Sequence, residues 1–456
     1  MWLCLPMFIL WSRNYVQRVQ QVGPRGLQNL GNTCYFNSVM QNLVNTYIFH
    51  TSIYENKYRG EFNRRFERFC RWMNDRQVAP NSGWNLWHLL CSKIQQFNEP
   101  RTMHRMFSSK ALRFADHQQH DSHECLRHFL DELRKEEREC RPKSQLSSSD
   151  PRKSLTVVDK VFGGHFITVY TCQECGSPYH LFEPFLDISL PICLGSINPD
   201  RMNSDHAVVR NLHMSLQAYA NASAKIMTRL SDPLAYKRQF QDAQGYSIND
   251  CLWYFTRTEH IQNEYLCNHC CSMHTENVSS VVGLTSATKQ TLIFNPPAVF
   301  TIHLKRFEVK PGRSEKRSDR IRYEELLDIA PYCSESCLRN DPPEKKLWYS
   351  LYGIVVHSGS LEFGHYYAYI KIRHDEPDMK KFLQEEYFDR DTTKDQLIKM
   401  MEMMEIRRNQ VRGKERQWSV NVNEGIWFCM NDNWVSEVTV DEVLNQEAYL
   451  LFYERI

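Results

Sequence analysis

The sequence lacks several features that would direct it to a particular class of protein. Its 56 Lys and Arg residues nearly balance its 54 Asp and Glu residues, so the formal net charge is only +2. A chain without a dominant charge does not favour bulk nucleic acid as a partner. No apolar run is long enough to span a bilayer, and no internal repeat is present. We therefore expect neither a nucleic-acid partner nor a membrane anchor.

The N-terminal segment also lacks the marks of a secretory signal. The run from Met1 to Leu10 is apolar, but no basic residue precedes it and no small-residue cleavage site follows it. We expect residues 1–22 to be a leader segment. The chain has 16 cysteines without a tight disulfide framework, which argues against a secreted, disulfide-rich protein. Both observations favour an intracellular location, in the cytoplasm and/or the nucleus.

The periodicity of apolar residues predicts a mixed α+β chain. Hydrophobic residues make up 42% of the 456 residues, enough for a sizeable core. Helical patterns fill residues 23–140, and the period changes to that of a strand from Phe162. Two stretches, 192–246 and 374–424, read as insertions, and the basic residues 308–320 predict an exposed loop. The predicted strands cover residues 163–170, 299–304, 351–357, 365–371, 426–430 and 449–453.

One cysteine stands between a polar loop and a helical pattern. Cys34 follows a glycine-punctuated stretch that begins at Gly26, and apolar residues recur after it at helical spacing. A thiol near a helix N-terminus is favoured as a thiolate by the unpaired N–H groups and the macrodipole. Cys34 is therefore the candidate nucleophile, which requires a base, an orienting group and an oxyanion donor.

A base and its orienting group can be nominated late in the chain. His365 follows Gly364 and opens an alternating aromatic strand, which would be a rigid mount for a general base. Asn431 and Asp432 follow another predicted strand, and either could orient the imidazole. Asn-Asp-Asn is also good turn chemistry, so these residues could merely form a polar turn.

The oxyanion donor has a candidate close to the nucleophile. Asn29 lies five residues before Cys34, and its side-chain amide could point at a developing oxyanion. The alternative is that Asn29 only stabilises the loop through an Asx turn.

Two Cys-x-x-Cys pairs predict a structural zinc site. The first pair is Cys172 and Cys175, and the second is Cys267 and Cys270. Two such pairs supply the four thiolates of a tetrahedral zinc site, with no open coordination position for catalysis. Cys271 is a spare thiol beside the second pair.

Several ordered motifs together resemble the ubiquitin-specific protease family of deubiquitinating enzymes. The sequence is similar to the family's Cys box at Gly26–Ser38 and to its His box from Tyr352 to Tyr369. Gln119-His120-Asp121 resembles its Gln-Gln-Asp box, with His120 replacing the second Gln. Leu304-Lys305-Arg306-Phe307 and Glu447–Tyr453 also match. Residues around Asn42 and Val161–Gly164 resemble the branch that contains histone-directed deubiquitinases.

This resemblance implies a papain-like cysteine protease hand within residues 23–456. The helical thumb would cover about 23–160, the zinc-tied β fingers about 161–290 and the β-rich palm about 291–456. The implied partners are ubiquitin and ubiquitinated proteins, histones among them, and Asp121 would contact the basic ubiquitin tail.

The resemblance also assigns chemistry to the nominated residues. Cys34 would form a thioester with the terminal glycine of ubiquitin, with His365 as base and then acid. Asn431, with or without Asp432, would orient His365, and Asn29 would stabilise the oxyanion. The alternative is a catalytically weak or inactive ubiquitin-binding scaffold on the same fold.

Overall fold

The computed structural model describes most of the chain and divides it into two compact units. The first unit comprises residues 1–146, 353–376 and 424–446, and the second comprises 147–352, 377–423 and 447–456. The predicted leader 1–22 and nearly all of the two predicted insertions lie outside the described residues. Within the described residues, no helix is both long and apolar enough to cross a membrane. The described residues are 23–74, 99–116, 118–142, 155–192, 246–273, 284–310, 313–334, 347–360, 363–373, 383 and 425–456.

Helix α2 (Cys34–Asn45) is the central helix of the first unit. Every residue of α2 except Asn45 is buried, which marks it as a core helix. An aromatic cluster packs beside it: the ring of Phe129 lies 5.5 Å from that of Phe107 and 5.0 Å from that of Phe66. Other helices of this unit are α3 (Tyr47–Glu55), α4 (Glu61–Asn74), η1 (Leu112–Phe114), α6 (Ser122–Glu139) and α15 (Val440–Leu444), and residues 99–110 are also helical.

An antiparallel sheet completes the first unit, and α2 packs against its strand β11. Asn42 of α2 donates from Nδ2 to the carbonyl of Ile354 at 3.3 Å. A Cβ at Gly353 would lie only 2.0 Å from Asn42 Oδ1, so the glycine is what lets the helix and the strand approach this closely. The sheet has the order β13 (Trp434–Val438), β12 (Ile426–Asn431), β11 (Gly364–Ile372) and the part of β10 (Trp348–Gly359) that belongs to this unit.

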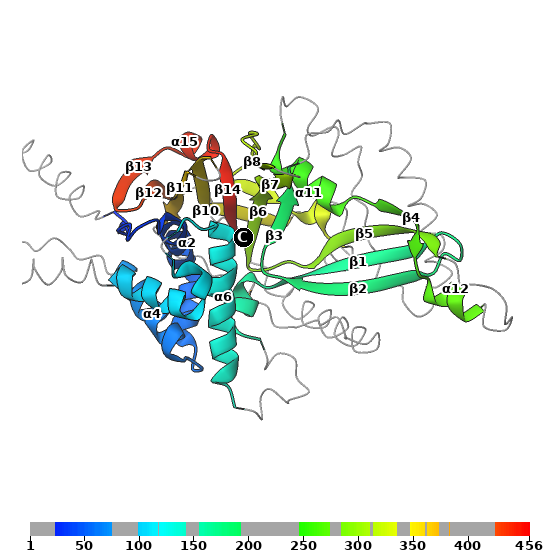
Figure 1. Ribbon diagram of the computed structural model, residues 1–456, viewed down its shortest axis with the longest axis horizontal. Helices are drawn as coiled ribbons and strands as arrows, with labels where there is room; N and C mark the ends of the chain where they lie inside the picture. Colours follow the sequence, from blue (N-terminus) through cyan, green and yellow to red (C-terminus); the bar gives the residue numbers. More distant parts are fainter. Residues whose placement is uncertain are drawn as a thin grey trace, which may run out of the picture. The chain divides into compact units, whose positions relative to one another are not determined.

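The second unit contains a long four-stranded antiparallel sheet, which Figure 1 shows with α12 near its far end. The strand order is β2-β1-β5-β4. The two central strands, β1 and β5, carry buried apolar side chains. Ile167 and Leu292, for example, are paired across these strands and are both buried. The elements are β1 (Gly164–Cys172), β2 (Pro178–Phe185), β4 (Glu259–Tyr265), β5 (Thr285–Asn295) and α12 (Asn268–Met273).

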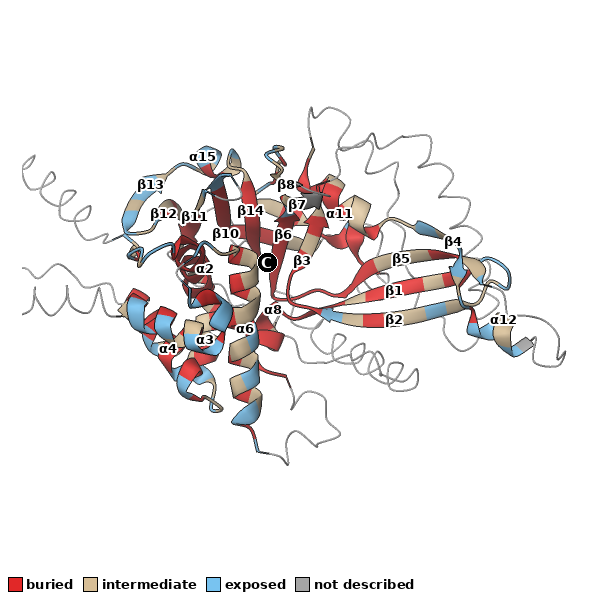
Figure 2. Cartoon of the chain, in the orientation of Figure 1, coloured by how far each residue is buried: buried red, intermediate tan, exposed pale blue. Residues whose placement is uncertain are grey.

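The core of the second unit lies around β6 (Val299–Lys305), which is buried on both faces (Figure 2). It pairs with β14 (Ala448–Arg455) on one side and in parallel with β3 (Ile188–Pro191) on the other. Two helices of this unit begin with a capping box, at Thr156 and Ser247. The remaining elements are α8 (Val157–Phe162), α11 (Ile248–Thr256), β7 (Phe307–Lys310), β8 (Arg313–Lys316), β9 (Leu326–Asp328) and η3 (Ala330–Tyr332).

The predicted strands are confirmed as β1, β6, β10, β11, β12 and β14, but the predicted loop over 308–320 was wrong in its first half. That half forms the β7–β8 hairpin, and the backbone N–H of Arg317 donates to the carbonyl of Arg306 at 2.7 Å. The Arg306 guanidinium explains the difference, because it is 1% exposed and donates to the carbonyls of Arg317 and Asp319. The buried Arg306 cation, between β6 and β7, thus organises a segment whose composition is that of a polar loop.

Candidate active site and cysteine cluster

Cys34 is the first residue of α2, as the sequence predicts, and it is 4% exposed. The loop before it turns sharply at Gly31 and Asn32, which have φ values of +106° and +55°. Asn29 holds this turn, because its Oδ1 accepts hydrogen bonds from the backbone N–H groups of Gly31 at 3.0 Å and Thr33 at 3.1 Å. The oxygen of Asn29 therefore serves the loop, while its exposed amide nitrogen is left for another role.

His365 is the second residue of β11, and a tight strand junction fixes the backbone before it. The N–H of Gly364 donates to Gln119 Oε1 at 3.1 Å, which ties this junction to the segment before α6. A Cβ at Gly364 would lie 1.9 Å from His357 Nε2, so only glycine fits between the two histidines.

The structure brings His365 and Asn431 into direct contact. The distance between His365 Nε2 and Asn431 Oδ1 is 2.7 Å, and a carbonyl oxygen can only accept, so Nε2 carries the hydrogen. Asp432 Oδ2 lies 3.9 Å from the same nitrogen, beyond hydrogen-bond length. Of the two residues nominated as the orienting group, Asn431 is therefore the one in position.

The surroundings of His365 favour its charged form. A hydrogen bond with Cys34 raises the pKa of His365 to about 9, assisted by Asn431 and the nearby Asp432 carboxylate, although partial burial opposes the shift. At neutral pH the His365 imidazole therefore keeps its proton.

Asp432 accepts from two amides rather than from the imidazole. Its Oδ2 receives Asn29 Nδ2 at 3.0 Å, and its Oδ1 receives Asn37 Nδ2 at 2.8 Å. Asn37 lies on α2 one turn after Cys34, so both amides come from the segment around the nucleophile. The sequence reasoning missed Asn37, although an asparagine one turn after the candidate nucleophile was a usable signal.

The segment before α6 contains Asp121 and His120, whose roles were open. Asp121 is the N-cap of α6, and its Oδ1 accepts from the backbone N–H groups of His123 and Glu124. His120 Nε2 lies 2.6 Å from Asp116 Oδ1, and its ring packs edge-on against Tyr35. The histidine that replaces the second Gln of the Gln-Gln-Asp box thus has an internal structural role.

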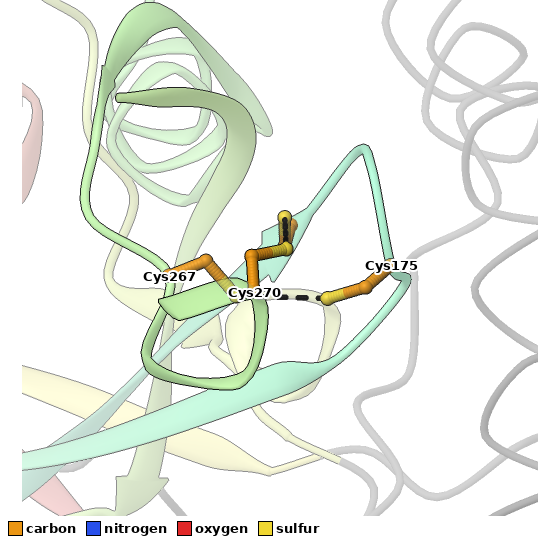
Figure 3. A group of neighbouring side chains, drawn as sticks. Cys175, Cys267 and Cys270 are labelled. Carbon is orange, nitrogen blue, oxygen red and sulfur yellow. Dashed lines mark hydrogen bonds between the residues drawn. The ribbon is translucent and has the colours of Figure 1, made fainter. Parts of the chain in front are cut away.

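The four predicted zinc ligands lie together at the end of the four-stranded sheet. Cys172 is the last residue of β1, and Cys175 lies on the turn between β1 and β2. Cys267 directly precedes α12, and Cys270 lies in its first turn. Figure 3 shows the side chains of Cys175, Cys267 and Cys270 converging. The Sγ atoms of Cys175 and Cys267 are 3.6 Å apart, and those of Cys172 and Cys270 are 3.8 Å apart. All four Sγ atoms lie within 4.8 Å of one another.

These separations fit a tetrahedral ion bound by four thiolates. A Zn–S bond of about 2.3 Å implies neighbouring sulfurs about 3.8 Å apart, because the edge of a tetrahedron is about 1.63 times its centre-to-vertex distance. The local backbone suits such a site: the N–H of Gly176 donates to the carbonyl of Cys172, and that of Cys271 donates to the carbonyl of Cys267. Burial raises the pKa of the Cys175 thiol, but hydrogen bonds from Ser177 and the neighbouring thiols outweigh burial and leave the pKa at about 6. The cluster can therefore hold a metal ion.

The site combines a cysteine at a helix start with a histidine that hydrogen-bonds an asparagine, on an α+β fold. These are the side chains of a cysteine hydrolase. The family model described as ubiquitin carboxyl-terminal hydrolase matches residues 25–453. The chain therefore belongs to the ubiquitin carboxyl-terminal hydrolase family and is of the ubiquitin-specific protease type.

Curated relatives carry the same family name. Probable ubiquitin carboxyl-terminal hydrolase 16 of Schizosaccharomyces pombe is 24% identical over 436 residues, which cover 94% of this chain and 66% of that protein. Ubiquitin carboxyl-terminal hydrolase 16 of Mus musculus is 31% identical over 269 residues, 57% of this chain and 29% of that protein. Ubiquitin carboxyl-terminal hydrolase 45 of Homo sapiens is 23% identical, and the match covers 96% of this chain and 78% of that protein. The chain spans less than two thirds of the length of the first two relatives.

A solved structure confirms the predicted fold class. A chain of the SAGA Ubp8/Sgf11/Sus1/Sgf73 DUB module bound to ubiquitin aldehyde superimposes with a TM-score of 0.59 at 20% identity. The match covers 96% of this chain and 70% of that chain. The boundaries of thumb, fingers and palm stay a prediction.

Proposed function

We propose that this protein is a thiol-dependent ubiquitinyl hydrolase, which cleaves the isopeptide bond between the terminal glycine of ubiquitin and a lysine of a substrate protein. One observation carries the proposal: His365 Nε2 hydrogen-bonds Asn431 Oδ1 at 2.7 Å, and the Cys34 thiol is close enough to raise the pKa of the same imidazole. A nucleophile, a base and an orienting carbonyl in this sequence of contacts are what acyl transfer from an amide requires.

The first half-reaction forms a thioester. The Cys34 thiolate attacks the carbonyl carbon of the terminal glycine, and the carbonyl oxygen becomes an oxyanion. Asn29 donates an N–H to that oxygen. The His365 imidazolium gives its proton to the lysine nitrogen as the carbon–nitrogen bond breaks, so the leaving group departs as a neutral amine.

The second half-reaction regenerates the enzyme. The neutral imidazole of His365 removes a proton from water, and the resulting hydroxide attacks the thioester carbon. The carbon–sulfur bond breaks, and Cys34 returns as a thiolate beside the imidazolium. Ubiquitin leaves with a free carboxyl group, which loses its proton to solvent. Asn431 keeps the ring in the required orientation through both steps, because its carbonyl oxygen engages Nε2 in either charge state.

A mechanism-based probe tests the proposal. Ubiquitin carrying an electrophile at its C-terminus should form a covalent adduct on Cys34, identified by peptide mass spectrometry, and Cys34→Ala should abolish the adduct. Ubiquitin without the electrophile should compete. A folded protein that forms no adduct, or forms one on another cysteine, would refute the assignment.

A catalytically weak or inactive ubiquitin-binding scaffold is the second candidate function. Such a scaffold would bind ubiquitin without turnover, and its site would be incomplete. In the described residues every nominated catalytic position is filled by a competent side chain, and His365 hydrogen-bonds Asn431. The hydrolase is therefore the function that the geometry favours.

The cysteine cluster is proposed to hold a structural zinc ion. Cys172, Cys175, Cys267 and Cys270 would complete the coordination shell, which leaves no position for substrate or water. When bound, the ion would tie the β1–β2 turn to the turn before α12 and so stabilise the end of the sheet. Metal analysis of the purified protein should give one zinc per chain.

Ubiquitin and ubiquitinated proteins are the proposed partners, and the proposed location is the cytoplasm and/or the nucleus. None of the twelve cysteines in the described part of the chain forms a disulfide, which suits a reducing compartment. The sequence similarity to the histone-directed branch makes ubiquitinated histones the first substrate class to test. Hydrolysis of a ubiquitinated nucleosome, compared with a panel of linkage-defined diubiquitins, would identify the preferred substrate.

A further inference from the structure

We propose that Asn37 and Asp432 form a positioning pair that holds the oxyanion donor Asn29, and that Asp432 serves this pair rather than orienting His365. The inference rests on the proposed hydrolase function and adds a role to two residues of that site. It also separates the work of the adjacent residues Asn431 and Asp432.

The carboxylate of Asp432 is engaged on both oxygens by amides. Asn37 donates to Oδ1 at 2.8 Å, and Asn29 donates to Oδ2 at 3.0 Å. Such N–H to carboxylate hydrogen bonds are stronger than neutral ones. The distance of 3.9 Å from Oδ2 to His365 Nε2 leaves only a longer-range electrostatic contribution to the imidazole.

The same bonds determine which way the Asn29 amide faces. Its Oδ1 accepts from two backbone N–H groups of the loop, and one N–H of its Nδ2 points to Asp432. A primary amide has two N–H donors, so the second remains for an oxyanion. Three hydrogen bonds on one planar group fix its plane, which is the pre-organisation that an oxyanion donor needs.

The backbone around Asp432 is held just as firmly. Asp432 has a φ of +51°, a left-handed conformation that a non-glycine residue adopts only where its surroundings impose it. Its carbonyl accepts the N–H of Leu27 at 2.8 Å. A Cβ at Gly26 would lie 2.7 Å from the carbonyl oxygen of Asn433, so the turn and the loop are in direct backbone contact.

Asn37 anchors this arrangement in the core. It is 3% exposed, and its Nδ2 also lies 3.2 Å from the carbonyl of Gln28, beside Asn29. Without the Asn37 amide, Oδ1 of Asp432 loses a buried donor, and the carboxylate becomes free to rotate. The Asn29 amide would then lose its fixed direction while Cys34 and His365 stay in place.

Comparison of two buried amides on α2 tests the proposal. Gln41, one turn after Asn37, is also 3% exposed and donates to the carbonyl of Arg25 at 2.8 Å, but it does not touch Asp432. Asn37→Ala should lower kcat about tenfold with little change in KM, a part of the 10²–10³-fold expected for complete loss of an oxyanion donor. Gln41→Ala should leave kcat within about twofold, because it removes only a structural bond of similar kind. Equal losses of kcat in the two variants would overturn the pair.

A double-mutant cycle provides the second readout. In an Asn29→Ala background, Asn37→Ala should have no further effect on kcat, because the donor that it positions is gone. The rate of Cys34 alkylation by iodoacetamide should stay unchanged in Asn37→Ala, since that reaction has no oxyanion. If the kcat losses of the two single variants multiply in the double variant, or if alkylation slows, Asn37 acts on Cys34 and the proposal is contradicted.

A further variant covers the case in which Asn37→Ala does not fold. Asp432→Asn keeps the shape but places an amide opposite two donors, and it should show the same kcat loss and the same non-additivity with Asn29→Ala. Additive losses would overturn the pair. Failure of the wild-type protein to react with the ubiquitin probe would instead overturn the hydrolase itself, so the two failures are distinguishable.

Discussion

The candidate active site and the cysteine cluster are built in opposite ways. The cluster takes two residues from each of two tight turns, so each half is organised by three or four residues of local chain. The active site joins a loop and helix start near Cys34 to a strand start at His365 and a turn at Asn431. The cysteine cluster forms once its two local turns meet in the fold. The active site instead requires several segments distant in sequence to meet at once, with their side chains placed to within about half an ångström.

Among the variants that test the active site against the cysteine cluster, loss of the base should lower activity most. His365→Ala removes the proposed general base, which also protonates the leaving amine. The kcat/KM for ubiquitin hydrolysis should therefore fall by roughly 10⁴-fold or more. Ubiquitin affinity and circular dichroism should be unchanged, because no part of the core depends on this half-exposed side chain. Residual activity within about a hundredfold of wild type would show that another base operates.

Disruption of the cysteine cluster should affect stability and binding more than chemistry. Cys172→Ser removes one proposed zinc ligand, and we expect loss of bound metal, a thermal midpoint lower by several degrees and about tenfold weaker ubiquitin binding. Alkylation of Cys34 by a small reagent should be unaffected, since the cluster lies in the other unit.

Cys271→Ser is the matched control for the cluster. Cys271 is the direct neighbour of Cys270 but is not one of the four converging thiols. This variant should retain both metal and stability. Identical behaviour of the two serine variants would reject the four-cysteine assignment.

Substitution of Asn431 should lower turnover less than loss of the base, and a shift in pH dependence should reveal it. The pKa of His365 is raised to about 9, partly by Asn431, so wild-type kcat/KM should decline only as the pH rises through about 9. Asn431→Ala should lower kcat by roughly ten- to a hundredfold and move this alkaline limb to lower pH. Asn431→Asp should keep most of the wild-type activity. Asp432→Ala should slow turnover less than Asn431→Ala does and should leave the alkaline limb of the pH profile nearly unchanged. An unmoved limb in Asn431→Ala would contradict its orienting role.

The sign of the effect on stability follows from the same shift. A raised folded-state pKa means that the charged His365 contributes stability fully below its unfolded value of about 6.5, and that this contribution is lost as the pH rises through about 9. The difference in unfolding free energy between wild type and Asn431→Ala should therefore shrink over that interval.

The sequence predicted the elements that have a strong apolar period and missed those that do not. Strands β10 and β11 are mostly buried and alternate or run continuously apolar, so they were readable. Strand β4 is largely exposed and polar, and β13 carries an exposed Trp434, so neither had a pattern. Strand β6 is buried on both faces, although Thr301 and His303 alternate with its apolar residues. Burial by partners distant in sequence is invisible to local periodicity.

The sequence by itself determined the candidate nucleophile and the four clustered cysteines, because their signals are local: a helix start for Cys34 and a fixed spacing for each Cys-x-x-Cys pair. Only the tertiary structure decided between Asn431 and Asp432, which are adjacent in the chain and chemically similar. The reason is geometric, since successive residues at the end of a strand point in different directions. Asn431 therefore meets His365, while Asp432, turned by its left-handed backbone, meets Asn29 and Asn37.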